Sequence, residues 1–286
     1  MSSDAKSRDK FYTKPEATQR LLSLVDLSQY DLIVEPSAGA GNISLLLRSV
    51  TLSPSLLLPH CLALDIEPDH PSVIKRDFLL TDHPEIHQAK KCLVIGNPPF
   101  GKMAGGAIAF FNRAASYESV KAIAFIVPKT FRKTSVINKL DSAFLLSTEV
   151  DIPDRSFTLE GRDHAVPCLI QVWHRSRLRR TPIPTPVLDS HYRFVKEEEA
   201  YRLTQEGTSV IVLTRVGGRA GTNNRIYDPS IKRLSQESHL FLVSDLNLNH
   251  IIAELNKIEW PHNTVGQRSV SKSEYTEELN QIASGR

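Results

Sequence analysis

Residues 31–49 place an apolar run, a turn of small residues and a second apolar segment in direct succession. The first run, 31–35, is typical of a buried strand, and a helix-like pattern begins at Ile43. The turn between them reads Pro-Ser-Ala-Gly-Ala-Gly-Asn, which lets the backbone approach a ligand while the helix start supplies free N–H groups. A nucleotide-binding βαβ unit opens in this way, although a plain tight turn has the same pattern. We therefore expect an α/β fold with a mostly parallel sheet flanked by helices.

Acidic residues end the next two strand-like runs. The run 61–64 stops at Asp65, 24 residues after the last glycine of the turn, where folds of this kind hold a ribose diol. The run 73–78 is predicted as a short strand that ends in Asp77 and Phe78, an acceptor for an adenine amine and a cover for its ring. Surface acids at strand ends are the alternative interpretation.

A fourth apolar run, 92–95, stops abruptly at Gly-Asn-Pro-Pro-Phe. The two prolines stiffen the backbone and lack N–H donors. The side-chain oxygen of Asn97 and the carbonyl oxygen of Pro98 can each accept one N–H hydrogen bond, so this turn can hold a planar amine. Phe100 can then stack on the ring that carries the amine. A simple strand-end turn is the alternative, because Asn-Pro commonly starts turns.

Together these motifs resemble, in order and spacing, the class I S-adenosylmethionine-dependent amino-methyltransferases. They are most similar to N6-adenine methyltransferases in which the cofactor motifs precede the catalytic tetrapeptide, and the resemblance spans about residues 11–175. It implies that an N-terminal Phe-Tyr-Thr motif closes over the methionine end of the cofactor. The implied cofactor-binding residues are Phe11, Tyr12, Thr13, Glu35, Pro36, Ser37, Gly39, Gly41, Asp65, Asp77, Phe78 and Asn97. The implied catalytic residues are Asn97, Pro98, Pro99 and Phe100.

The implied reaction is methyl transfer from S-adenosylmethionine to an exocyclic amine, with adenine N6 in nucleic acid first and DNA favoured over RNA. Enzymes that methylate a protein glutamine or guanine N2 of ribosomal RNA share the Asn-Pro-Pro-aromatic motif and are the nearest alternative. Phe rather than Tyr at position 100 and the basic side chains in the loops of the C-terminal region favour adenine. A non-catalytic nucleic-acid-binding subunit of the same fold is the alternative of another class, but such subunits usually lose the tetrapeptide or the glycine-rich turn.

Composition divides the rest of the chain. Residues 1–10 are polar and predict a disordered tail, residues 11–180 the catalytic domain, and residues 190–286 a small α+β target-recognition appendage. An Arg- and Pro-rich run, 175–186, predicts the boundary between the two domains. The loop 51–59 is longer than a compact βα unit needs and reads as an insertion.

Two local patterns predict helices. Thr13 with Glu16 fits a capping box in front of a helix that has Pro15 in its first turn. Residues 140–146 suggest another helix.

Basic side chains are candidates for phosphate contacts, although solvated surface charges give the same pattern. The net charge of +3 is mildly basic and permits a nucleic-acid partner. The candidates follow predicted strands or lie in Gly- and Ser-rich loops. They are Lys102, Lys129, Arg132, Arg215, Arg219, Arg268 and Lys272.

The remaining composition restricts location and cofactors. No apolar run approaches the ~20 residues of a membrane span, and the first ten residues lack a secretory core. Three scattered cysteines, without the spacing of metal ligands, are predicted to be reduced core residues. We expect a cytoplasmic protein, nuclear in a eukaryote, with no metal and no membrane partner, acting as a monomer or with a partner subunit.

Overall fold

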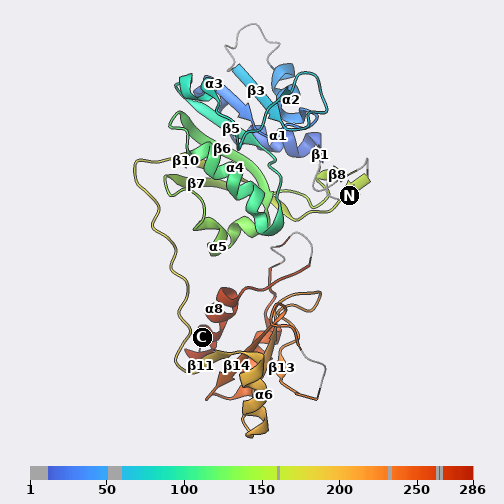
Figure 1. Ribbon diagram of the computed structural model, residues 1–286, viewed down its shortest axis with the longest axis vertical. Coiled ribbons are helices and arrows are strands. Elements are labelled where there is room, and N and C mark those ends of the chain that lie inside the picture. Colours follow the sequence, from blue (N-terminus) through green and yellow to red (C-terminus); the bar gives the residue numbers. More distant parts are fainter. Residues whose placement is uncertain are drawn as a thin grey trace. The chain divides into compact units, whose positions relative to one another are not determined.

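The computed structural model describes residues 12–50, 60–159, 162–230, 234–261, 264 and 267–285. The chain forms two compact units, residues 1–183 and residues 184–286 (Figure 1). The predicted N-terminal tail, Phe11 and the predicted insertion 51–59 lie outside the described residues.

A seven-stranded sheet forms the centre of the first unit. Its strands, in spatial order, are β4 (Ile74–Lys75), β3 (His60–Asp65), β2 (Leu32–Glu35), β5 (Cys92–Gly96), β6 (Val120–Pro128), β10 (Cys168–Arg175) and β7 (Phe144–Asp151). The first five strands are parallel, whereas β10 lies antiparallel between β6 and β7. This mostly parallel sheet confirms the predicted α/β fold class.

The chain reverses its direction of travel across the sheet after β4. It moves outward from β2 to β3 and β4, then returns to β5 on the other side of β2. The carboxyl ends of β2 and β5 therefore flank the switch point, which is where open α/β sheets bind ligands. Glu35, Asp65 and Gly96 end the strands β2, β3 and β5 at this edge.

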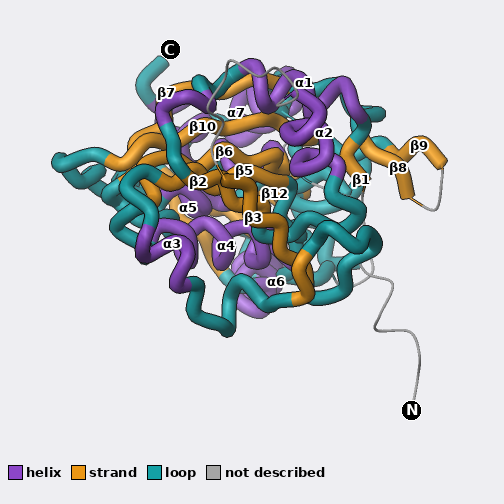
Figure 2. Tube along the Cα trace, turned by 90° about the horizontal axis from the view of Figure 1, so that it is seen from above, coloured by secondary structure: helices purple, strands orange, loops and turns teal. Residues whose placement is uncertain are grey.

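Helices cover both faces of the sheet (Figure 2). Helices α1 (Pro15–Ser23) and α2 (Asn42–Val50) pack one face through Leu21 and Ile43. Helices α3 (Pro84–Gln88), α4 (Gly105–Ala115) and α5 (Thr134–Ile137) pack the other face through Ile86, Phe111 and Val136. Because both faces are covered, the central strands are buried apolar runs without alternation, as their sequences predict.

A separate three-stranded sheet brings the N-terminal segment to the main sheet's carboxyl edge. β1 (Tyr12–Thr13) pairs antiparallel with β8 (Phe157–Leu159), which forms a hairpin with β9 (Arg162–His164). An ion pair of 2.7 Å between Lys14 Nζ and Asp163 Oδ1 also connects the residue after β1 to β9.

The second unit contains a four-stranded antiparallel sheet with helices on both faces. Its elements are β11 (Tyr192–Val195), α6 (Glu197–Gln205), β12 (Ile211–Thr214), β13 (Arg225–Ile226), β14 (His239–Ser244), α7 (Leu248–Lys257) and α8 (Lys272–Ala283). Alternation along β12 explains the two faces: Ile211 and Leu213 pack with α7 and α8, whereas Val212 packs with α6.

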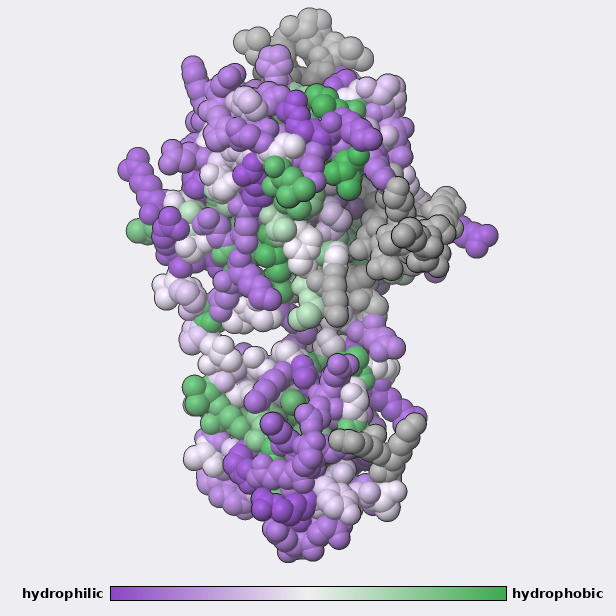
Figure 3. Space-filling view, viewed as in Figure 1, coloured by the Kyte–Doolittle hydropathy of each residue, from purple (hydrophilic) through white to green (hydrophobic). Residues whose placement is uncertain are grey.

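Hydrophilic residues predominate on the face of each unit seen in Figure 3. Among the described helices, none is long and apolar enough to cross a membrane. Burial raises the thiol pKa of Cys61 to about 11, and Cys92 and Cys168 are buried in the core.

Three local predictions were wrong. Lys14 is the N-cap of α1 and makes no side-chain cap, so Thr13 forms no capping box. Residues 140–146 contain no helix, because β7 begins at Phe144. The strand predicted over 73–78 is only the two-residue β4. Lys272 is the first residue of α8, which Ser271 opens with a capping box.

Candidate active site

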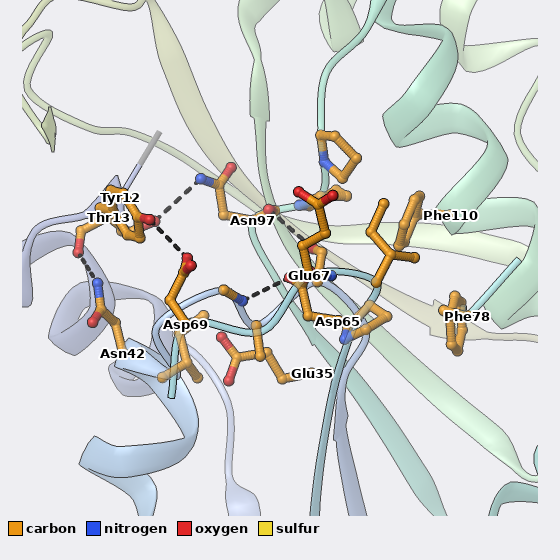
Figure 4. A pocket seen from close by; sticks show the side chains of 18 of the residues that line it. Tyr12, Thr13, Glu35, Asn42, Asp65, Glu67, Asp69, Phe78, Asn97 and Phe110 are labelled. Atoms are coloured by element: carbon orange, nitrogen blue, oxygen red, sulfur yellow. Dashed lines mark hydrogen bonds between the residues drawn. The ribbon is translucent and has the colours of Figure 1, made fainter. Parts of the chain in front are cut away.

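A pocket of about 500 Å³ lies at the carboxyl ends of β2, β3 and β5 (Figure 4). This volume is in the range of small-molecule sites. Its wall combines β1, the turn after β2, the segments after β3 and β4, and the turn after β5. The sequence-predicted residues that line it are Tyr12, Thr13, Glu35, Pro36, Ser37, Gly39, Asp65, Asp77, Phe78, Asn97, Pro98, Pro99 and Phe100.

Two glycines of the turn after β2 adopt left-handed backbone angles, with φ of +50° at Gly39 and +78° at Gly41. The N–H of Gly39 donates to Asp65 Oδ2 at 2.7 Å, which ties the turn to the end of β3. Gly41 does not line the pocket; an added Cβ there would lie 3.1 Å from Ser44 Oγ and 3.3 Å from Val73. Gly39 therefore shapes the pocket wall, and Gly41 permits close packing behind it.

Glu35 is a buried carboxyl group, only 3% exposed, at the end of β2. The N–H of Ser44, in the first turn of α2, donates to its Oε2 at 2.9 Å. Burial raises the pKa of Glu35 from 4.5 to about 7, because loss of hydration outweighs the hydrogen bonds from the helix start.

Asp65 and Asp77 are both held by backbone N–H groups. Asp65 Oδ1 accepts from the N–H of Glu67 at 2.8 Å, in addition to the bond from Gly39. Asp77 Oδ1 accepts from the N–H groups of Leu79 and Leu80 at 2.8 and 3.0 Å. Each carboxylate is thus fixed in place and keeps acceptor capacity toward the pocket.

Aromatic and aliphatic side chains form an apolar end of the pocket. The ring of Phe78, 1% exposed, stacks between His83 and Phe110 at centroid distances of 5.2 and 5.7 Å. Ile66 lines the same pocket and is 61% exposed. Phe78 is covered by its neighbours, whereas Ile66 and the half-buried Phe110 present apolar surface.

Three hydrogen bonds join β1 to the other walls of the pocket (Figure 4). The hydroxyl of Tyr12 donates to Asp69 Oδ2 at 2.7 Å. Asn42 Nδ2 donates to the carbonyl oxygen of Thr13 at 3.0 Å, and Asn97 Nδ2 donates to Thr13 Oγ1 at 3.2 Å. β1 is therefore bonded to the segments that follow β2, β3 and β5.

The tetrapeptide 97–100 forms a closely packed turn beside this strand. The hydroxyl of Ser37 donates to the backbone oxygen of Asn97 at 3.2 Å. Pro98 is buried, and no described residue donates a hydrogen bond to its carbonyl oxygen. The ring of Phe100 is 5% exposed and packs edge-on against Phe157 of β8, with centroids 6.3 Å apart.

Two of the basic candidates, Lys129 and Arg132, follow β6 in the first unit. Lys129 Nζ lies 3.3 Å from Asp151, and Arg132 Nε lies 2.7 Å from Glu149, so β7 supplies acidic partners to both. The side chain of Lys102 is outside the described part of the structure.

The other four candidates belong to the second unit. Arg215 and Arg268 donate to the backbone oxygens of Val270 and Trp260, respectively. Arg219 and Lys272 are exposed, and Lys272 Nζ lies 4.6 Å from the ring centroid of Phe194.

Sequence reasoning missed several pocket residues: Asn42, Ile66, Glu67, Asp69 and Phe110. Asn42 was detectable as the polar residue that opens α2 after the glycine-rich turn. Glu67 and Asp69 were also detectable, as acids that follow the end of a predicted strand, but acids in this position fit a surface loop equally well. Phe110 precedes the core residue Phe111, and only the helix orientation separates their roles.

No protein-family model and no curated protein sequence matches the chain. Among solved structures it is similar to the Type IIL restriction-modification enzyme MmeI in complex with DNA, at 12% identity and a TM-score of 0.46, over 91% of this chain and 63% of that one. It is also similar to the 23S rRNA methyltransferase ErmE, at 14% identity and a TM-score of 0.42, over 59% of this chain and 71% of that one. Similarities this weak assign neither substrate nor cofactor to the chain.

Proposed function

We propose that this chain transfers a methyl group from S-adenosylmethionine to an exocyclic amine, with adenine N6 of nucleic acid as the first candidate and DNA favoured over RNA. The observation that carries the proposal is the pocket itself. One wall of the pocket presents the amide of Asn97 and the carbonyl oxygen of Pro98, to which no described residue donates a hydrogen bond. Another wall presents carboxylates that are held by backbone N–H groups, together with the apolar end of the pocket. An amine-holding turn therefore lies beside a site with the chemistry of a nucleoside pocket.

The pocket's chemistry fits S-adenosylmethionine. Asp65 has acceptor capacity left for a ribose diol, and Asp77 has Oδ2 for an adenine amine. Ile66 and Phe110 offer apolar surface to the adenine ring. Besides the buried Glu35, four acidic side chains line the pocket, which suits a ligand that carries a sulfonium and an ammonium group; they are Asp65, Glu67, Asp69 and Asp77.

When bound, S-adenosylmethionine supplies a methyl group on a positively charged sulfur. The residues of the chain have the task of activating the amine, whose lone pair is delocalised into the adenine ring. Asn97 Oδ1 and the Pro98 carbonyl would accept the two amine hydrogens, which localises the lone pair and fixes its direction. Both acceptors stabilise the amine more strongly once it becomes cationic, so the proton can leave after methyl transfer without a strong general base.

One observation favours a smaller substrate. Because Phe100 is only 5% exposed, it offers little area on which a flipped base can stack. A protein glutamine side chain needs no such surface, and its amide nitrogen is planar and carries two hydrogens, like the exocyclic amine of adenine. It is therefore the second candidate.

Product identity tests the proposal. The full chain is incubated with tritiated S-adenosylmethionine and, separately, with DNA, RNA and a protein extract, and the labelled products are digested and identified chromatographically. We expect label in N6-methyladenine, with DNA above RNA. Label in methylglutamine would replace adenine as the target, and no label in any sample would refute methyl transfer. The variant Asn97→Ala controls for contaminating methyltransferases.

A further inference from the structure

Thr13 occupies a fixed position next to Asn97. Its side chain is buried, at 7% exposure, and its backbone belongs to β1, paired in register with Phe157 of β8. The carbonyl oxygen accepts from Asn42 Nδ2 at 3.0 Å, and the next residue, Lys14, donates from its N–H to Ser156 at 2.9 Å. None of these contacts involves Asn97, so the backbone that carries the Thr13 hydroxyl is held in place independently of Asn97.

A carboxamide has two ends of similar shape and opposite hydrogen-bonding character. The torsion that turns one end into the other is soft, so the partners of the amide decide which end faces a ligand. Asn97 Nδ2 donates to Thr13 Oγ1 at 3.2 Å, and Oδ1 is therefore directed away from Thr13. A reversed amide would present N–H groups to the substrate amine, donor against donor.

We propose that Thr13 is a positioning residue whose hydroxyl holds the amide of Asn97 with its oxygen available to the substrate amine. The role goes beyond the cofactor contact that the sequence motif implies, and it rests on the proposed function only for its catalytic consequence. Through Asn42, at the start of α2, the same residue connects the glycine-rich turn with the tetrapeptide. The carbonyl oxygen of Thr13 thus ties β1 to the start of α2, while its hydroxyl contacts the amide of Asn97.

The substitution Thr13→Val keeps the shape and removes the hydroxyl, whereas Thr13→Ser keeps the hydroxyl. The matched control is Thr18→Val in α1, a threonine that is 1% exposed and bonds the carbonyl of Lys14 within its own helix, away from the pocket. If Thr13 acts by packing alone, the methyl-transfer rate of Thr13→Val should equal that of wild type, and the rate of Thr13→Ser should be lower. The positioning role predicts the opposite order.

Nuclear magnetic resonance tests the contact without any need for methyl transfer. In protein labelled with ¹⁵N-asparagine, the side-chain signals of Asn97 are identified by their absence from the Asn97→Asp spectrum. We expect one amide proton shifted downfield and slow to exchange in wild type and Thr13→Ser, and this signature lost in Thr13→Val. Two fast-exchanging amide protons in wild type would overturn the proposal, even if Thr13→Val failed to fold.

Single-turnover methylation tests the consequence. We expect Thr13→Val to lower the methyl-transfer rate about 3- to 10-fold, as for one neutral hydrogen bond, with recovery in Thr13→Ser and no change in Thr18→Val. Affinity for S-adenosylhomocysteine should change less than the rate. An equal fall in rate and affinity would overturn the positioning role. A wild-type protein without any methyl transfer would refute the proposed function while leaving the spectroscopic test intact.

Discussion

Asp65 accepts hydrogen bonds from Gly39 and Glu67, so its carboxylate fixes both the glycine-rich turn and the segment after β3. We expect Asp65→Ala to lower affinity for S-adenosylhomocysteine about 10- to 150-fold, the equivalent of one charge-assisted hydrogen bond of about 1.5–3 kcal/mol. Isothermal titration calorimetry measures the effect. Asp82→Asn is the control, because Asp82 is an exposed acid bonded to His87 outside the pocket. Equal affinity in Asp65→Ala and wild type would exclude a ribose contact.

The buried Glu35 makes stability depend on pH. Its pKa is raised from 4.5 to about 7, so the folded chain holds this proton more tightly than the unfolded chain. The resulting stabilisation is complete below pH 4.5 and is lost as the pH rises through 7. Glu35→Gln cannot ionise and keeps an oxygen for the N–H of Ser44. We expect the free energy of unfolding of Glu35→Gln, relative to that of wild type, to rise by about 3 kcal/mol as the pH increases from below 4.5 to above 7.

Urea unfolding of both proteins at pH 5, 6, 7 and 8 measures this gain. Glu16→Gln, on the exposed first turn of α1, controls for the loss of a carboxylate. A difference between Glu35→Gln and wild type that stays constant with pH would contradict the raised pKa.

Some individual site residues were predictable because their position follows from local pattern. Asp65 and Asn97 come directly after apolar runs, and parallel strands bring such ends to one edge of a sheet. Ile66 and Phe110 were not predictable in this way. Their apolar side chains look like core residues in the sequence, and only tertiary packing turns them toward the pocket.

At the scale of the element, the first turn of α4 supports the tetrapeptide. An added Cβ at Gly106 would lie 2.3 Å from the carbonyl oxygen of Pro99, whereas one at Gly105 would meet nothing within 4 Å. We expect Gly106→Ala to lower the free energy of unfolding by about 1–3 kcal/mol and to slow methyl transfer. Gly105→Ala should leave both unchanged, or raise stability by up to about 1 kcal/mol.

Chemical denaturation and single-turnover rates compare these two variants, which differ by one position in the same helix. Equal behaviour of both would mean that the contact between α4 and Pro99 does not support the tetrapeptide.

Elements buried on both sides were the most predictable. Each of β2, β5 and β6 contains a continuous buried apolar run, which only a covered sheet accommodates. β7 was mistaken for a helix in its first residues because Leu145 and Leu146 form an apolar pair on an edge strand, where they are 39% and 40% exposed. The insertion of β10 between β6 and β7 depends on pairing between distant segments, which local patterns do not record.

At the scale of the whole molecule, the second unit has a polar interior network that its Gly- and Asn-rich segment 217–224 did not reveal. Asn224 Oδ1 accepts from the hydroxyl of Tyr275 at 2.9 Å, and the indole of Trp260 donates to the carbonyl of Gly221 at 3.0 Å. Arg268 donates to the backbone oxygen of Trp260 and so supports this network. Substitution of Arg268 would therefore disturb this network as well as any phosphate contact, so Arg268 is a poor test of nucleic-acid binding.

Arg219 is the clearest test of nucleic-acid binding by the second unit. Its side chain is exposed, and no described residue accepts a hydrogen bond from its guanidinium group. If it contacts a phosphate, Arg219→Gln should weaken binding and flatten the slope of log affinity against log salt by about 0.9 for duplex DNA or 0.7 for single strands. Lys257→Gln is the control of equal charge, because Lys257 is paired with Glu254 at 2.7 Å.

Fluorescence anisotropy with labelled DNA and RNA across a salt series measures both variants, and calorimetry with S-adenosylhomocysteine checks the cofactor site. We expect Arg219→Gln alone to change the slope, with cofactor affinity intact, because every residue that lines the pocket belongs to the first unit. Equal slopes for Arg219→Gln and Lys257→Gln would mean that Arg219 acts only through net charge. If wild type itself bound nucleic acid without salt dependence, the second unit would have no phosphate-binding role. Glutamine in protein would then become the leading substrate, because its recognition requires no phosphate contacts.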